Sequence, residues 1–203
     1  MSPNEPTVFI VDDDASVRDS LEYLLRSVGL GAKKFASATE FLEVYDPGSP
    51  GCLVLDVRMP GMSGLELQEE LEERGSTLPI VFVTAHGDVP MAVHAVKAGA
   101  VDFLIKPFRD QELLDKVQQA LQEDAKVREK LQDRGAVADR IASLTPRERE
   151  VMKMVVDGKA NKVIAIDLGI SQRTVEIHRA RMMEKMQVAS VAQLVQMVMR
   201  GRE

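Results

Sequence analysis

The stretch Cys52-Leu53-Val54-Leu55-Asp56-Val57-Arg58-Met59-Pro60-Gly61 decides how this chain folds. A short apolar run that is rich in branched side chains and stopped by Pro-Gly predicts a strand buried on both faces. Asp is a poor strand former, so Asp56 at the end of the run indicates one of two roles. It either has a task at the carboxyl edge of a sheet or opens the turn before Pro60. The residues at the ends of the other strands decide between these roles.

Strands and helices alternate through the first 123 residues, which form the first expected domain. This alternation predicts a parallel sheet covered by helices on both sides. The expected strands are Val8–Val11, Ala32–Phe35, Leu53–Asp56, Ile80–Thr84 and Asp102–Ile105. The expected helices are Ala15–Val28, Thr39–Tyr45, Gly64–Arg74, Val89–Ala98 and one that begins near Asp110.

Charged and hydroxyl side chains stand where four of these strands end, at Asp12-Asp13-Asp14, Asp56, Thr84 and Lys106. Because the carboxyl ends of parallel strands share one edge of a sheet, we expect these groups to meet there. Three carboxylates in one pocket, from Asp12, Asp13 and Asp56, need a cation, and oxygen ligands without His or Cys favour Mg2+. Capping of the first helix by Asp13 or Asp14 is the metal-free alternative, but it does not explain why Lys106 and Thr84 arrive at the same edge.

The two halves of the chain carry opposite charge. Of the 203 residues, 1–124 contain 22 acidic and 10 basic side chains, whereas 125–203 contain 10 acidic and 16 basic ones. An acidic half joined to a basic half predicts two domains with different partners, the basic one a nucleic-acid binder. No apolar run approaches the roughly 20 residues of a membrane span, and the N-terminus lacks secretory features. Cys52 is a single thiol that cannot form an internal disulfide, and its place in an apolar run suits a reducing compartment. We therefore expect a cytoplasmic protein without a membrane partner.

Residues 124–142 are expected to form a helical linker. The segment alternates acidic and basic side chains, contains no Pro and keeps a thin apolar stripe. A helix should therefore continue from the first domain and be interrupted or end near Gly135. A short coiled coil is the alternative to a solvated spacer, but Asp124 and Arg128 break its seam.

Residues 143–203 have the pattern of a small domain of four helices. Thr145, Pro146 and Glu148 have the spacing of a capping box with Pro at the first helical position. Further helices are expected at Asn161–Leu168, from about Gln172 to Met186, and at Val191–Met199. The glycine turn Gly169-Ile170-Ser171 predicts a helix-turn-helix, whose second helix lies in the major groove of DNA. A solvated helix of a small bundle is the alternative, and the basic charge of this half favours DNA.

The strand-end motifs resemble the receiver domain of two-component response regulators. They are Val11-Asp12-Asp13, Leu55-Asp56-Val57-Arg58-Met59-Pro60-Gly61-Met62-Ser63-Gly64, Thr84-Ala85 and Lys106-Pro107-Phe108. The resemblance covers residues 7 to about 123 and implies an α/β domain with a doubly wound sheet in the strand order 2-1-3-4-5. It also implies that Asp56 accepts a phosphoryl group, that Thr84 and Lys106 contact this group, and that Asp12, Asp13, Asp56 and the Arg58 backbone carbonyl hold Mg2+. A carboxylate nucleophile suits such a transfer, which needs positioning and charge neutralisation more than covalent help.

The same resemblance implies a switch formed by Thr84 and Phe103, in which the aromatic ring turns inward when Thr84 follows the phosphate. A plain packing role for Phe103 is the alternative. Phosphorylation would then drive dimerisation through the face formed by Val89–Ala98 and the fifth strand. Arg58 and His86 vary among receivers, and each either sets the rate at which water removes the phosphoryl group or is a solvated loop residue.

The second domain resembles the LuxR-type DNA-binding domain through Leu144-Thr145-Pro146-Arg147-Glu148-Arg149-Glu150-Val151, Leu168-Gly169-Ile170-Ser171 and Arg173-Thr174-Val175. The whole chain thus resembles the FixJ/NarL-type response regulators. The resemblance implies DNA-backbone contacts for Lys162, Thr174, His178 and Lys185. It places Glu176, Ile177, Ala180 and Arg181 toward the bases, and Arg173 and Arg179 complete the basic third helix.

We therefore expect a DNA-binding transcription factor that a sensor histidine kinase phosphorylates on Asp56, with dimerisation and promoter binding as the result and RNA polymerase as a further partner. It would accept and slowly lose its own phosphoryl group and would not be a turnover enzyme. An aspartate-based phosphatase is one alternative, but Arg58 stands where its second, acidic Asp is needed. A constitutive DNA-binding protein with a degenerate receiver is another, yet every pocket residue is present.

Overall fold

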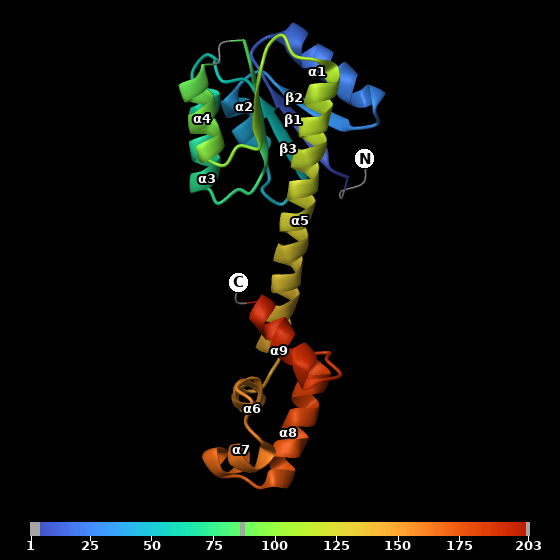
Figure 1. The fold of residues 1–203 in the computed structure, drawn as a ribbon, viewed down its shortest axis with the longest axis vertical. Helices are drawn as coiled ribbons and strands as arrows, with labels where there is room; N and C mark the ends of the chain where they lie inside the picture. The colour runs from blue at the N-terminus through green and yellow to red at the C-terminus, as the bar shows by residue number, and fades with distance from the viewer. Residues whose placement is uncertain (1–4, 86–87, 202–203) are drawn as a thin grey trace. The chain divides into compact units, whose positions relative to one another are not determined.

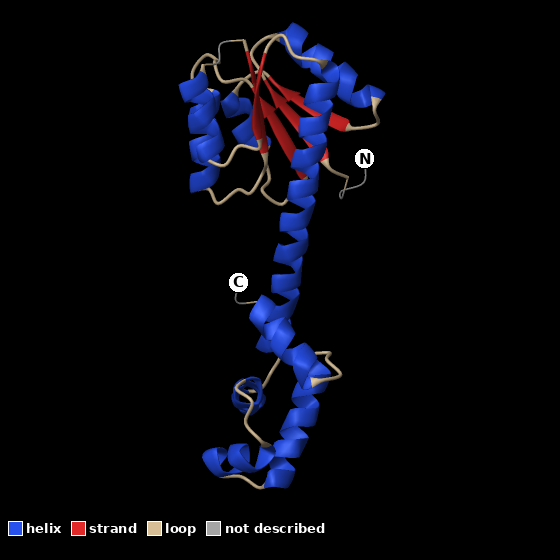
Figure 2. Ribbon diagram, in the orientation of Figure 1, coloured by secondary structure: helices blue, strands red, loops and turns tan. Residues whose placement is uncertain are grey.

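The computed structural model describes residues 5–85 and 88–201 and divides the chain into two compact units, Met1–Arg128 and Glu129–Glu203 (Figures 1 and 2). The first unit is a five-stranded parallel sheet in the order β2-β1-β3-β4-β5, as expected. Its strands are β1 (Thr7–Val11), β2 (Gly31–Phe35), β3 (Gly51–Leu55), β4 (Ile80–Thr84) and β5 (Asp102–Ile105). Its helices are α1 (Ala15–Ser27), α2 (Ala38–Val44), α3 (Gly64–Glu73), α4 (Val89–Lys97) and the beginning of α5 (Asp110–Ala142).

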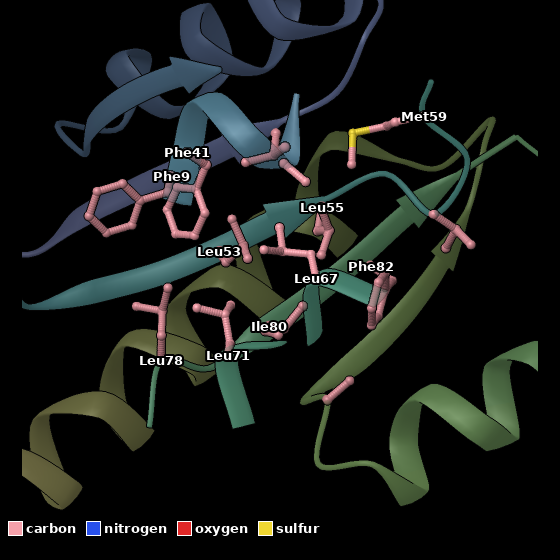
Figure 3. Packing of buried hydrophobic residues seen from close by; sticks show 14 of the residues in the cluster. Phe9, Phe41, Leu53, Leu55, Met59, Leu67, Leu71, Leu78, Ile80 and Phe82 are labelled. Carbon is pink, nitrogen blue, oxygen red and sulfur yellow. The ribbon is translucent and has the colours of Figure 1, made fainter. Parts of the chain in front are cut away.

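Two apolar clusters cover the two faces of this sheet. Helices α2, α3 and α4 pack on one face, where Phe9, Phe41 and Leu67 belong to one cluster (Figure 3). Helices α1 and α5 cover the other face with a second cluster. Successive side chains of a strand point to opposite faces, so β3 sends Leu53 and Leu55 to the first cluster and Cys52 and Val54 to the second. Full burial of such side chains contributes about 1.5–3 kcal/mol each, so β3 contributes to the stability of both clusters.

Cys52 is expected to stay unreactive as long as the first unit is folded. Its side chain is fully buried in β3, and burial raises the pKa of its thiol to about 12. Because the thiolate is the reactive form, Ellman's reagent at mildly alkaline pH should label Cys52 only after unfolding, and labelling in urea should follow the loss of circular dichroism. Rapid labelling of the native protein would contradict this burial.

Helix α5 is longer than the sequence suggested. It runs from Asp110 to Ala142, so the prediction that it is interrupted or ends near Gly135 is wrong. A Gly inside a helix costs only about 1 kcal/mol relative to Ala, and tertiary contacts readily exceed that cost. The contacts here belong to the second unit, where Ile141 packs on the core and Arg140 Nη1 donates to the Met186 carbonyl at 3.5 Å.

The second unit consists of the end of α5 and of α6 (Pro146–Val156), α7 (Asn161–Leu168), α8 (Gln172–Lys185) and α9 (Val191–Arg200). Both hydrogen bonds of the predicted capping box between Thr145 and Glu148 are present at the start of α6. Gly169 ends α7 in the left-handed conformation with φ of 64°, and the Ser171 side chain caps α8. These residues give the unit the helix-turn-helix that their pattern predicted. Within residues 5–85 and 88–201, no helix has both the length and the apolar character that crossing a membrane requires.

Candidate functional site at the carboxyl edge of the sheet

The strand ends bring four of the predicted residues to one edge of the sheet. Asp12 follows β1, Asp56 follows β3, Thr84 ends β4 and Lys106 follows β5. Asp12, Asp56 and Thr84 are buried, with exposed fractions of 3%, 8% and 1%. Polar side chains at such burial need partners, and those partners define the site.

Lys106 connects the two buried carboxylates. Its Nζ donates to Asp12 Oδ2 at 2.7 Å and lies 3.7 Å from Asp56 Oδ1. The remaining oxygens accept from the backbone, Asp12 Oδ1 from the Asp14 N–H and Asp56 Oδ2 from the Arg58 N–H, both at 2.9 Å. One ammonium group thus compensates two carboxylates at a shielded sheet edge, which is the preorganised environment that a charged nucleophile needs.

The electrostatics of Asp56 follow from this geometry. Burial raises the pKa of the Asp56 carboxyl above its ordinary value, and the Asp12 carboxylate acts in the same direction. Lys106, the Arg58 N–H and a hydrogen bond with Thr84 oppose that rise by stabilising the charged form. A carboxylate that is partly desolvated yet held by donors combines reactivity with a fixed orientation.

The structure gathers fewer carboxylates than expected. Asp13 is exposed, and among the described residues no three acidic, His or Cys side chains lie close enough together to hold a metal ion. The expectation that Asp12, Asp13 and Asp56 crowd one pocket is therefore corrected to a pair, because like charges repel and Lys106 compensates two of them. Asp14 is the N-cap of α1 and accepts from the Ser16 N–H at 2.8 Å, so the capping alternative holds for Asp14 alone.

Phe103 and Ile105 lie on β5 directly beside β4. The strand register pairs Phe82 with Phe103 and Thr84 with Ile105, and the Phe82 and Phe103 rings lie 5.9 Å apart. Phe103 is half-buried against the first cluster, whereas Ile105 is 51% exposed. Beside Phe82 and Thr84, β5 thus places an aromatic ring in contact with the core and an exposed aliphatic side chain.

Gly64 sets the distance between α3 and the loop that carries Asp56. A Cβ added at Gly64 would lie 2.2 Å from the Asp56 carbonyl oxygen, and that backbone cannot shift cheaply. We expect Gly64→Ala to destabilise the first unit by about 1–3 kcal/mol in urea unfolding and to slow phosphoryl acceptance.

Gly135→Ala is the matched control for this prediction, because no atom lies within 4 Å of a Cβ added there. Since Ala is the better helix former, this variant should gain up to about 1 kcal/mol. Equal effects of the two substitutions would contradict the close approach at Gly64.

Five of the residues predicted to face DNA form one exposed face on α8. Arg173, Glu176, Ile177, Ala180 and Arg181 are exposed and follow the helical spacing i, i+3, i+4, i+7 and i+8. Val175, Met182 and Met186 are buried in the core, while Ile177 is 42% exposed. Ile177 therefore does not fill an inward position of α8, and its exposure agrees with a place on the base-facing side.

Three further residues predicted to contact DNA have partners or positions inside the unit. Lys185 Nζ donates to the buried Glu148 at 2.7 Å and to the Ser143 carbonyl at 3.2 Å. Arg179 Nη1 donates to Asn161 Oδ1 at 2.8 Å and so joins α8 to α7. His178 Nδ1 is buried without a hydrogen-bond partner among the described residues. These contacts leave one Lys185 N–H for a phosphate, so its DNA contact stays a prediction.

Thr174 is half-buried beside the Ser171 cap, where the two hydroxyl groups lie 2.8 Å apart, and Lys162 is exposed on α7.

The site at the carboxyl edge of the sheet also includes Arg18, which the sequence did not single out. Its Nη1 donates to the Asp12 carbonyl at 2.6 Å. The sequence indicated Arg18 only by its position, one turn into the helix that follows three Asp residues. The Arg58 side chain is exposed, and His86 lies outside the described residues.

Comparisons with known proteins agree with this geometry. Residues 8–118 match the family described as the response regulator receiver domain, and residues 142–198 match the bacterial regulatory proteins of the luxR family. Nodulation protein W of Bradyrhizobium diazoefficiens is 50% identical over 190 residues, which cover 94% of this chain and 84% of that protein. The regulator FixJ of Azorhizobium caulinodans is 48% identical over 197 residues, which cover 97% and 93%.

Two solved structures extend the similarity to the whole fold. The response regulator StyR is 50% identical with a TM-score of 0.90, and the alignment covers 97% of this chain and 99% of StyR. Full-length FixJ from B. japonicum is 44% identical with a TM-score of 0.59 and 98% coverage of both chains.

A receiver sheet followed by a luxR-type helix-turn-helix defines a transcriptional regulator of two-component systems. The chain belongs to the response regulators that combine these two domains, the group that includes FixJ. Its receiver implies a sensor kinase as partner, and its luxR-type domain implies promoter DNA.

Proposed function

We propose that Asp56 accepts a phosphoryl group from a sensor histidine kinase and that this modification promotes dimerisation and promoter binding. The observation that carries the proposal is the buried Asp56 carboxylate, held by the Arg58 N–H with Lys106 Nζ 3.7 Å away. In the transfer, the phosphorus–nitrogen bond of the kinase phosphohistidine breaks and a phosphorus–oxygen bond to Asp56 forms. Water later removes the group, so the protein loses its own phosphoryl group and does not turn over as an enzyme.

Mg2+ is the proposed cofactor, because the available donors are oxygens and a hard cation prefers them. Asp12, Asp13, Asp56 and the Arg58 backbone carbonyl would hold it, and it would neutralise charge on the phosphoryl oxygens. Lys106 would supply the second positive charge, and Thr84 would donate its hydroxyl to the phosphoryl group. The donor set fits the ion in chemistry because all of its ligands are oxygens, and Asp13 would supply its carboxylate from an exposed position.

The α4–β5 face is the proposed dimer contact. Val89, Val93, Val96 and Ile105 are between 46% and 76% exposed, and an apolar face of this kind commonly marks an interaction surface. Thr84 and Phe103 would carry the change from Asp56 to this face, since they lie on the adjoining strands β4 and β5. The exposed face of α8 would then read promoter DNA in the cytoplasm, with RNA polymerase as a further partner.

Val93→Asp is expected to prevent dimerisation while phosphoryl acceptance continues. In sedimentation velocity, beryllofluoride with Mg2+ should convert the wild-type chain from monomer to dimer and leave the variant a monomer, because a charge in an apolar contact is costly. Val44→Asp is the matched control, since Val44 is 65% exposed on α2, and it should dimerise like wild type. A wild-type chain that stays monomeric with beryllofluoride would refute the dimer proposal.

A further inference from the structure

Helix α5 stays attached to the first unit beyond the end of its apolar face. Its buried side chains Leu113, Val117 and Ala120 recur at helical spacing against the sheet. The next position on this stripe is Asp124, which is only 2% exposed although it is a carboxylate. Burial of a charge is costly unless it is paired and hydrogen-bonded, so the partners of Asp124 indicate its role.

Asp124 is paired with Arg128 and with the first residue of β3. Its Oδ2 accepts from the Gly51 N–H at 2.9 Å, and Arg128 Nε lies 2.9 Å and 2.8 Å from its two carboxylate oxygens. The guanidinium group also donates to the α2–β3 loop, to the Gly48 carbonyl at 2.8 Å and to the Ser49 carbonyl. We call Asp124 and Arg128 with these partners the α5 clamp.

The loop side of the clamp is closely fitted. A Cβ added at Gly51 would lie 1.9 Å from the Thr7 carbonyl oxygen of β1, so only a residue without a side chain fits at the start of β3. Pro47 and Pro50 restrict the loop whose carbonyls accept from Arg128. The clamp therefore joins α5 to a part of the sheet that is itself fixed.

The clamp and the phosphoacceptor lie at opposite ends of the same strand. Gly51 begins β3 and Asp56 follows its last residue, a span of about 16 Å for five residues. All five residues of this strand are buried, and close-packed interiors have low compressibility and transmit strain. The first compact unit also ends at Arg128, so the clamp lies at the end of the part of α5 that belongs to this unit.

We propose that Asp124 and Arg128 are positioning residues that hold the end of the first unit's part of α5 against the sheet and connect it through β3 to Asp56. The proposal rests on the proposed function of Asp56 as the phosphoacceptor. Without the clamp, α5 would keep its apolar contacts up to Leu121, and the next two turns would be free of the sheet. The phosphorylation state of Asp56 would then have less influence on the helix that continues into the second unit.

The test compares a double variant with a matched control in the full chain. Asp124→Ala with Arg128→Ala removes both charges and leaves no unpaired buried one. Lys126→Ala with Glu129→Ala removes an exposed pair of the same charges from the same helix. Hydrogen exchange measures the clamp itself, and the DNA probe is a duplex that the beryllofluoride-treated wild-type chain selects from a random pool.

In the clamp variant we expect exchange of the Gly51 amide to rise at least about tenfold while the β3 interior stays protected. The ratio of DNA affinities with and without beryllofluoride should fall at least about fivefold, and the control should match wild type in both measurements. If exchange of the Gly51 amide is faster but the affinity ratio is unchanged, the pair is merely structural and the proposal is overturned. Unchanged exchange of the Gly51 amide would also overturn the proposal. A wild-type ratio of one would instead refute Asp56 as the input, a failure that does not depend on the variants.

Discussion

Asp56→Asn is expected to abolish the response of DNA affinity to phosphodonors while the first unit stays folded. Asn has nearly the same shape and can accept from the Arg58 N–H, but its amide oxygen is not a competent nucleophile toward phosphorus. Phosphate-affinity electrophoresis with acetyl phosphate should show no modified band. Fluorescence anisotropy should give equal DNA affinities with and without the donor, which means a coupling free energy near zero.

The stability of this variant provides an independent check. Burial raises the pKa of Asp56, so the charged carboxylate is held at a cost that the neutral amide does not carry. We expect Asp56→Asn to unfold at a urea concentration no lower than wild type, while Lys106 keeps its 2.7 Å partner Asp12. Asp46→Asn, at an exposed loop position, should leave phosphorylation unchanged. A variant that still responds to the donor would move the acceptor to another carboxylate.

The first unit and its pocket were predictable because both depend on patterns local in sequence. Five apolar runs define the strands, and parallel strands align their carboxyl ends whatever the details of packing. Asp12, Asp56, Thr84 and Lys106 therefore meet as expected. The strand order came from the resemblance rather than from periodicity, because no single strand carries information about its neighbour.

The contacts that escaped prediction join residues far apart in the chain. Asp124 and Arg128 were interpreted as breaks in an apolar seam, but a partner 73 residues away, the Gly51 N–H, makes the Asp124 position a buried one. Gly135 was expected to interrupt α5, and tertiary contacts of the second unit outweigh its low propensity. Likewise, periodicity did not indicate that Lys185 is paired with the buried Glu148 carboxylate within the second unit.

Lys185→Met is expected to destabilise the second unit by about 1–2 kcal/mol in urea unfolding. Removal of one partner from a fully buried pair costs about 3–5 kcal/mol because the remaining charge is left unpaired, and Glu148 is 3% exposed. Lys185 keeps 37% of its side chain exposed, so solvent reaches the pair and lowers the expected cost. Lys153→Met, which replaces an exposed lysine of α6, should change stability by less than about 0.5 kcal/mol.

The pH dependence separates this ion pair from a simple loss of packing. The Lys185 ammonium group holds the pKa of Glu148 below its ordinary value of 4.5, with help from the Thr145 N–H. The pair therefore stabilises the unit fully above that ordinary value, and its contribution is lost as the pH falls through the lowered pKa of the folded state. The stability gap between wild type and Lys185→Met should accordingly close on acidification, and a gap that is constant with pH would contradict the ion pair.

Glu148→Gln combined with Lys185→Met distinguishes the structural role of Lys185 from a contact with DNA. The double variant has no unpaired buried charge, so it should regain most of the stability that the single variant loses. If Lys185 serves only the fold, DNA affinity will recover with stability. If its remaining N–H also contacts a phosphate, affinity will stay low and its dependence on salt will be weaker by about one counterion. The two measurements together assign the ammonium group to Glu148 alone or to Glu148 and DNA.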